Sequence, residues 1–143
     1  MFLTKFLFLA VIFLLTTAQV ATTPRWGIPT NPFNCSIAAL GTTLTQCQAA
    51  PATGLKNYIS SVTCASTTST ASTCLVRYGT GTNCATGTTS ILPTLQSPAN
   101  TGQPTNLSFS PVPLIPTAAN AICVIGGSAT NTTFVVITGF VAT

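Results

Sequence analysis

Apolar and polar residues alternate with a period of two in several short segments of this chain. In residues 105–110, Leu107 and Phe109 are separated by polar neighbours, which is typical of a half-buried β-strand. Segments 121–125 and 132–141 are the most apolar, and their β-branched residues favour buried strands over helices. Because no segment combines a helical period with capping residues, the pattern predicts an all-β chain.

Weaker patterns predict the remaining strands. Residues 42–49 form a plausible first strand, 57–65 a second, and 74–84 a hairpin that supplies two more. Residues 66–73 read as a connection, and 90–103 as a long loop with one short strand. Seven or eight short strands divided by turn residues are typical of an antiparallel β-sandwich or barrel.

The chain begins with a segment that resembles an export signal. Lys5 precedes ten unbroken apolar residues, 6–15, and Ala18 is a small residue suited to cleavage. The alternative is an N-terminal membrane anchor, but a membrane-spanning helix needs about 20 apolar residues. We therefore interpret residues 1–18 as a signal peptide, with cleavage after Ala21 as a variant.

This interpretation divides the chain into three parts. After the signal peptide, residues 19–41 contain three prolines and read as an extended N-terminal arm. Residues 42–143 then form the sandwich domain. The expected location is secreted or on an extracellular surface, with no membrane contact once the signal is removed.

Composition excludes most enzyme mechanisms. The sequence has no Asp, no Glu and no His, and its polarity comes from 29 threonines and 11 serines. It therefore lacks a carboxylate pair for glycoside hydrolysis, a base for a catalytic triad and a cage for a hard cation. We expect no catalytic residues, no metal and no cofactor.

The positive charge does not indicate nucleic-acid binding. The net charge of +4 comes from four scattered residues, Lys5, Arg25, Lys56 and Arg77, whereas nucleic-acid binding needs a clustered basic patch. A nearly neutral surface associates readily, so we expect self-association or assembly with other surface or virion proteins.

Six cysteines in an exported chain predict three disulfides, for which 15 pairings exist. One pairing follows from hairpin geometry. If the turn is centred on Gly79, Cys74 stands opposite Cys84, close enough for a disulfide.

Carbohydrate binding is the alternative function. Sugar sites stack rings on exposed aromatic side chains, and Trp26, Tyr58 and Tyr78 are the candidate platforms. The competing interpretation is structural: the two tyrosines cap the sandwich, and Trp26 fixes the arm to it.

Three Asn-x-Ser/Thr sequons begin at Asn34, Asn106 and Asn131. Such triplets arise by chance in a chain rich in Thr, Ser and Asn. In a eukaryotic source they are candidate glycosylation sites, Asn131 above the others.

The order of several motifs resembles a family of small jelly-roll domains in tailed-phage virion proteins and prophage-rich bacterial genomes. The motifs are AAPATGLKNYISSV at 49–62, LVRYGTGT at 75–82, FSPVPL at 109–114 and TAANAICV at 117–124. The resemblance covers about residues 42–143 and implies a non-catalytic structural or attachment role. The signal peptide and the six cysteines depart from that family and suggest an exported relative.

The resemblance also implies two disulfides. In a jelly roll we expect the second strand, 57–65, to run beside the next-to-last, 121–125, which places Cys64 near Cys123. Cys35 is then left to pair with Cys47. The resulting hypothesis is a secreted or surface-exposed structural or attachment subunit of a virion, appendage or cell surface.

Overall fold

The computed structural model describes residues 31–99, 103–109, 117–130 and 132–143. These residues form nine β-strands and one short 3-10 turn, η1 (Thr82–Cys84), and they contain no α-helix. The strands are β1 (Asn31–Leu40), β2 (Thr45–Gln48), β3 (Lys56–Ser66), β4 (Ser72–Thr80), β5 (Thr86–Ser90), β6 (Leu95–Ser97), β7 (Thr105–Ser108), β8 (Ala121–Gly126) and β9 (Thr133–Ala142).

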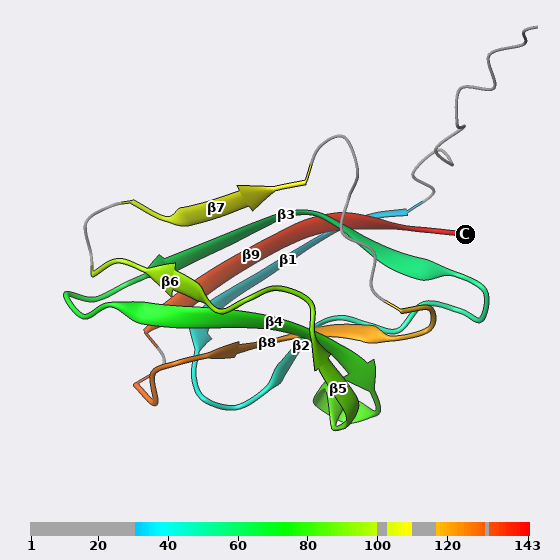
Figure 1. The fold of residues 1–143 in the computed structure, drawn as a ribbon, viewed down its shortest axis with the longest axis horizontal. Coiled ribbons are helices and arrows are strands. Elements are labelled where there is room, and N and C mark those ends of the chain that lie inside the picture. Colours follow the sequence, from blue (N-terminus) through cyan, green and yellow to red (C-terminus); the bar gives the residue numbers. More distant parts are fainter. Residues whose placement is uncertain (1–30, 100–102, 110–116, 131) are drawn as a thin grey trace, which may run out of the picture.

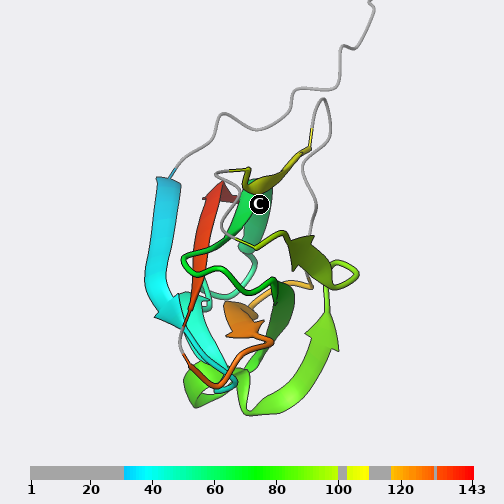
Figure 2. The same ribbon diagram turned by 90° about the vertical axis from the view of Figure 1, so that its left-hand side faces the viewer.

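The strands form two antiparallel sheets that pack face to face (Figure 1). Sheet A has the order β1-β9-β3-β7, and sheet B has the order β2-β8-β4-β5, with β6 also paired to β4. Figure 2 shows β1 (blue) at the edge of sheet A beside β9 (red). The predicted all-β sandwich is therefore confirmed.

Alternation along the strands builds one core between the sheets. Ile59 and Val62 of β3 and Ile137 of β9 are fully buried and face sheet B. Val76 of β4 and Ile122 of β8 are equally buried and face sheet A. Apolar burial on both inner faces is the main force that holds the sheets together.

Most of the predicted strands are confirmed. Segments 57–65, 105–110, 121–125 and 132–141 correspond to β3, β7, β8 and β9, and 42–49 contains β2. The short strand expected within 90–103 is β6.

The sheet begins earlier than the predicted domain boundary at residue 42. The last part of the predicted arm is β1, which pairs with β9 from Asn31 to Leu40. Inward-facing Phe33, Cys35 and Ile37 alternate with exposed polar neighbours. Pro32 fits here because β1 is an edge strand, where a missing backbone N–H breaks no ladder on the free side.

The predicted Cys74–Cys84 disulfide is wrong, because the hairpin turns later than Gly79. Thr80 of β4 pairs with Thr86 of β5, so the turn is centred on η1. Gly79 lies inside β4 opposite Ala121. Cys74 is consequently at the other end of β4, opposite Gly126 and Leu95.

The predicted Cys64–Cys123 disulfide is also wrong, because the two cysteines belong to different sheets. β3 lies beside β9 and β7 in sheet A, whereas β8 lies between β2 and β4 in sheet B. Cys64 instead bonds Cys74 of β4 across the core, and Cys123 bonds Cys84 of η1.

The predicted Cys35–Cys47 disulfide is present and joins β1 of sheet A to β2 of sheet B. All six cysteines are therefore oxidised, and two of the three bridges connect the sheets. Disulfides of this density indicate folding in an oxidising environment.

Candidate functional site

The side of sheet A that faces away from the core carries a row of partly exposed side chains, which continues beyond Tyr58 to Lys56 at the start of β3. Residues directly opposite each other on antiparallel strands project from the same face, so the strand register identifies them. From β9 and β3 they are Phe134, Val136, Thr138 and Phe140, and Tyr58, Ser61, Thr63 and Ala65. We call this set the outer face of sheet A.

Tyr58 anchors one end of the outer face of sheet A. Its ring stacks on Phe140, with ring centroids 5.0 Å apart and planes within 4°. Its hydroxyl donates a hydrogen bond of 3.1 Å to the backbone oxygen of Thr143. Next along the face, the hydroxyls of Ser61 and Thr138 are 2.6 Å apart. This end is thus an ordered aromatic and hydroxyl cluster.

A pocket of about 220 Å³ lies at the other end of the outer face of sheet A. The lining residues from sheet A are Phe134 of β9 and Thr63, Ala65 and Ser66 of β3. The other lining residues are Pro98, which follows β6, and Gln103 and Pro104, which precede β7. The pocket therefore combines an aromatic ring, two proline rings, an amide and hydroxyls, without a charge.

The structure does not bring the predicted aromatic platforms together. Tyr58 is on the outer face of sheet A, whereas Tyr78 is on β4 of sheet B, opposite Ile122. Trp26 lies outside the described residues. Phe134 and Phe140 are not among the predicted platforms, although the strand predicted over 132–141 places these two residues, six apart, on the same side.

Two of the three candidate glycosylation sites lie on exposed edge strands. Asn34 on β1 is exposed opposite Thr138, and Asn106 on β7 is exposed opposite Thr63. Both therefore belong to the side of sheet A that faces away from the core. Asn131 lies outside the described residues.

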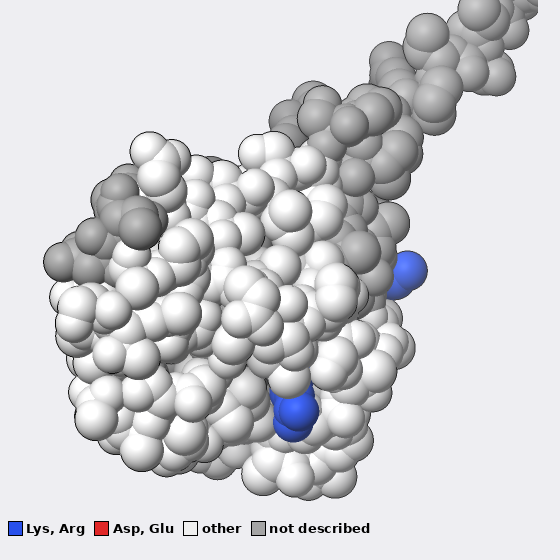
Figure 3. Space-filling model, turned by 60° about the vertical axis from the view of Figure 1, so that its left-hand side comes forward, with Lys and Arg blue, Asp and Glu red and all other residues white. Residues whose placement is uncertain are grey.

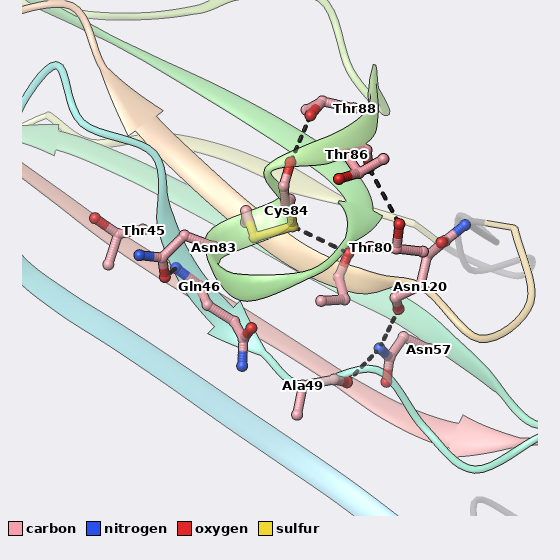
Figure 4. The surroundings of a disulfide bond; sticks show 12 residues. Thr45, Gln46, Ala49, Asn57, Thr80, Asn83, Cys84, Thr86, Thr88 and Asn120 are labelled. Atoms are coloured by element: carbon pink, nitrogen blue, oxygen red, sulfur yellow. Dashed lines mark hydrogen bonds between the residues drawn. A yellow bond between two sulfur atoms is a disulfide. The ribbon is translucent and has the colours of Figure 1, made fainter.

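The Cys84–Cys123 disulfide fixes a second, smaller buried cluster on the outside of sheet B (Figure 4). Cys84 adopts a left-handed backbone with φ 55°, and Thr88 Oγ1 donates a hydrogen bond of 2.5 Å to its carbonyl. The backbone N–H of Gln46 donates to Asn83 Oδ1 at 3.1 Å, which attaches β2 to the turn. These contacts indicate that η1 and its disulfide have a structural role.

Asn57 of β3 connects three segments of the chain through its buried side chain. Its side chain is fully buried, and Nδ2 donates hydrogen bonds of 3.0 Å to the carbonyls of Ala49 and Asn120 (Figure 4). It thereby joins β3 to the segments that enter β3 and β8. A buried amide with these partners serves as a structural connector.

Charged groups are sparse on the described surface. Lys56 and Arg77 are its two cationic side chains, and Figure 3 shows isolated blue patches on an otherwise white face. Within the described ranges, no group of three or more Cys, His, Asp or Glu side chains could hold a metal ion. The described residues contain no helix that is long and apolar enough to cross a membrane.

No protein-family model, curated protein or solved structure matches this chain.

Proposed function

We propose that this protein is a secreted, non-catalytic structural or attachment subunit of a virion, an appendage or a cell surface. The carrying observation is the disulfide-bridged sandwich with an almost uncharged surface. Three disulfides suit an exported protein. The sequence offers no carboxylate or imidazole for acid–base chemistry. The protein therefore acts through its surfaces.

We infer that the sandwich has jelly-roll topology. Sheet A takes the first, third, seventh and ninth strands, and sheet B takes the second, fourth, fifth and eighth, with the sixth also paired to the fourth. Strands that follow one another, such as β1 and β2 or β8 and β9, therefore cross from one sheet to the other. This interleaving supports a double Greek key, the arrangement common in capsid and lectin domains.

The edge of sheet A supplies a surface for assembly. β1 is ten residues long, carries no charged side chain and pairs with β9 along one side. Edge strands without charges or coverage are templates for pairing with another chain. Subunits of this kind add to one another through such an edge.

Native location tests the proposal. Protein from the natural source should be recovered in a particle or surface fraction, with an N-terminus at Gln19 or Thr22. Intact Met1 in that fraction would support a membrane anchor. Recovery in a reducing cytosolic fraction with free thiols would overturn the proposal.

Edge assembly has a separate test with a matched control. Ser36→Lys places a charge on the exposed side of β1, whereas Thr53→Lys places one on the exposed connection between β2 and β3. In sedimentation experiments on oxidised mature protein, Ser36→Lys should weaken self-association about tenfold. Equal effects of the two variants would contradict edge assembly.

Carbohydrate binding is the second candidate function. The observation that favours it is the outer face of sheet A, where half-buried aromatic rings stand among hydroxyls and the cationic Lys56 lies only at the Tyr58 end. Apolar rings with a few polar groups are the usual composition of a sugar site.

A further inference from the structure

We propose that the pocket beside Phe134 binds a single neutral sugar ring at the end of a glycan. This inference rests on the attachment function proposed above and gives it a ligand class and a location. The lining comes from three parts of the chain, on β3, β9 and the β6–β7 connection. The site is therefore a product of the fold.

The size of the pocket limits the ligand. Its volume of about 220 Å³ is below the range of about 300–1,000 Å³ that is typical of pockets for drug-sized molecules. One pyranose ring is a suitable occupant, whereas a longer oligosaccharide must continue outside the pocket. The outer face of sheet A, to which Phe134, Thr63 and Ala65 of the lining belong, continues along β9 through Val136 and Thr138.

The lining suits the two sides of a sugar. The Phe134 ring and the prolines at 98 and 104 offer apolar surfaces to the C–H face of a pyranose. The Gln103 amide and the Thr63 hydroxyl offer hydrogen bonds to its hydroxyls. Asn106 stands opposite Thr63 on the same face and places a second amide beside the pocket.

The charge distribution selects a neutral ligand. Lys56 is nine residues from Ala65 along β3, or about 30 Å at 3.3 Å per residue. Arg77 belongs to the other sheet. No described cation is therefore within reach of an anion in the pocket, so sulfated or sialylated sugars gain no charge partner there.

A pocket that holds one sugar ring binds it with low affinity. Assembly of many copies increases the overall affinity through avidity. Many copies on one particle convert weak individual contacts into firm attachment when their spacing matches that of the glycans. This expectation links the pocket to the edge of β1 on the same sheet.

Ligand-detected NMR on the oxidised mature protein tests the pocket. The probes are methyl glycosides of glucose, galactose, mannose, N-acetylglucosamine and N-acetylgalactosamine, with sialic acid as the anionic comparison. At least one neutral glycoside should bind, and sialic acid should not. Phe134→Ala should weaken binding about tenfold, and Gln103→Ala, in a connecting segment, tests the same site without altering a strand.

Phe140→Ala is the matched control, because it removes the same ring from the same face and strand without touching the pocket. It should retain binding. Loss of binding in Phe140→Ala but not in Phe134→Ala would move the site to the Tyr58 stack and overturn this inference. Absence of binding for every neutral glycoside would also overturn it. The proposed structural function would not be affected by that result, because native location and self-association test it separately.

Discussion

Gly139 of the central strand β9 pairs with Phe33 of β1 on one side and with Ile59 of β3 on the other. A Cβ at this position would be 2.5 Å from Phe33 Cζ and would also collide with the carbonyl oxygen of Tyr58. The collision partner on β3 is backbone, which cannot rotate away as a side chain can. The absence of a side chain at residue 139 thus sets how closely three strands of sheet A pack.

We predict that Gly139→Ala lowers the free energy of unfolding by about 3 kcal/mol, the upper end for overpacking. Gly54→Ala is the control, since nothing lies within 4 Å of its added Cβ and the cost comes from its φ of 87°. That cost is about 1 kcal/mol. Urea denaturation of both variants measures the difference, and equal losses would exclude a packing role for Gly139.

At the scale of elements, apolar runs and alternation predict most of the strands, whereas prolines and a lack of apolar residues conceal the others. The alternation of β7 and the apolar, β-branched run of β9 predict both strands correctly. β1 also alternates, with Phe33, Cys35 and Ile37 on one side, but Pro32 and the prolines that precede it favour an extended arm over a strand. β5, whose residues Thr86–Ser90 are all exposed, has no apolar face that a pattern could reveal.

The missed strand explains the wrong Cys64–Cys123 pairing. Without β1, the strand containing Cys64 counted as the second, and the second strand was expected beside the next-to-last. It is the third strand, and it lies beside the last, β9. The true second strand, β2, does lie beside the next-to-last, β8. The pocket at Phe134 was not predictable either, because its walls are brought together only by the tertiary fold.

Trypsin offers a direct test of the disulfide connectivity. Cleavage after Arg25, Lys56 and Arg77 divides the mature chain into three cysteine-containing peptides. With the observed pairing, each peptide holds one internal disulfide. We predict that a non-reducing digest gives three separate peptides, each lighter than its reduced form by two hydrogen atoms. A crosslink between peptides 57–77 and 78–143 would contradict this pairing.

The three disulfides should differ in their contribution to stability. Cys84–Cys123 closes a loop of 39 residues, whereas Cys64–Cys74 closes one of 10. Chain entropy then gives about 4 kcal/mol for the longer loop and about 3 kcal/mol for the shorter. Both pairs are fully buried, so replacing each pair by alanine leaves comparable packing defects.

We therefore predict that the double variant of Cys84 and Cys123 unfolds at a lower urea concentration than the double variant of Cys64 and Cys74. The reverse order would mean that the inter-sheet bridge acts mainly through the folded state. Circular dichroism at equal protein concentration measures both transitions.

At the scale of the whole molecule, the composition makes the free energy of unfolding nearly independent of pH in the acid range. Acid denaturation arises mostly because carboxylates that are paired in the native state take up protons, and because buried histidines become charged. The sequence has no Asp, Glu or His. Apart from the chain termini, no group with an ordinary pKa between about 3 and about 7 is present. Apolar burial and three disulfides hold the sandwich, and neither depends on protonation in this range.

We predict that the free energy of unfolding of the oxidised mature protein changes by less than about 1 kcal/mol between about pH 2 and about pH 7. Urea is the suitable denaturant, because it is uncharged and does not screen electrostatic interactions. The numbers of protons bound by the folded and unfolded states are nearly equal across this range, so the slope of stability against pH is close to zero. A loss of more than about 3 kcal/mol in acid would require proton uptake by groups other than the side chains of this chain. It would therefore point to a bound anion or partner that stabilises the native protein and is released on protonation.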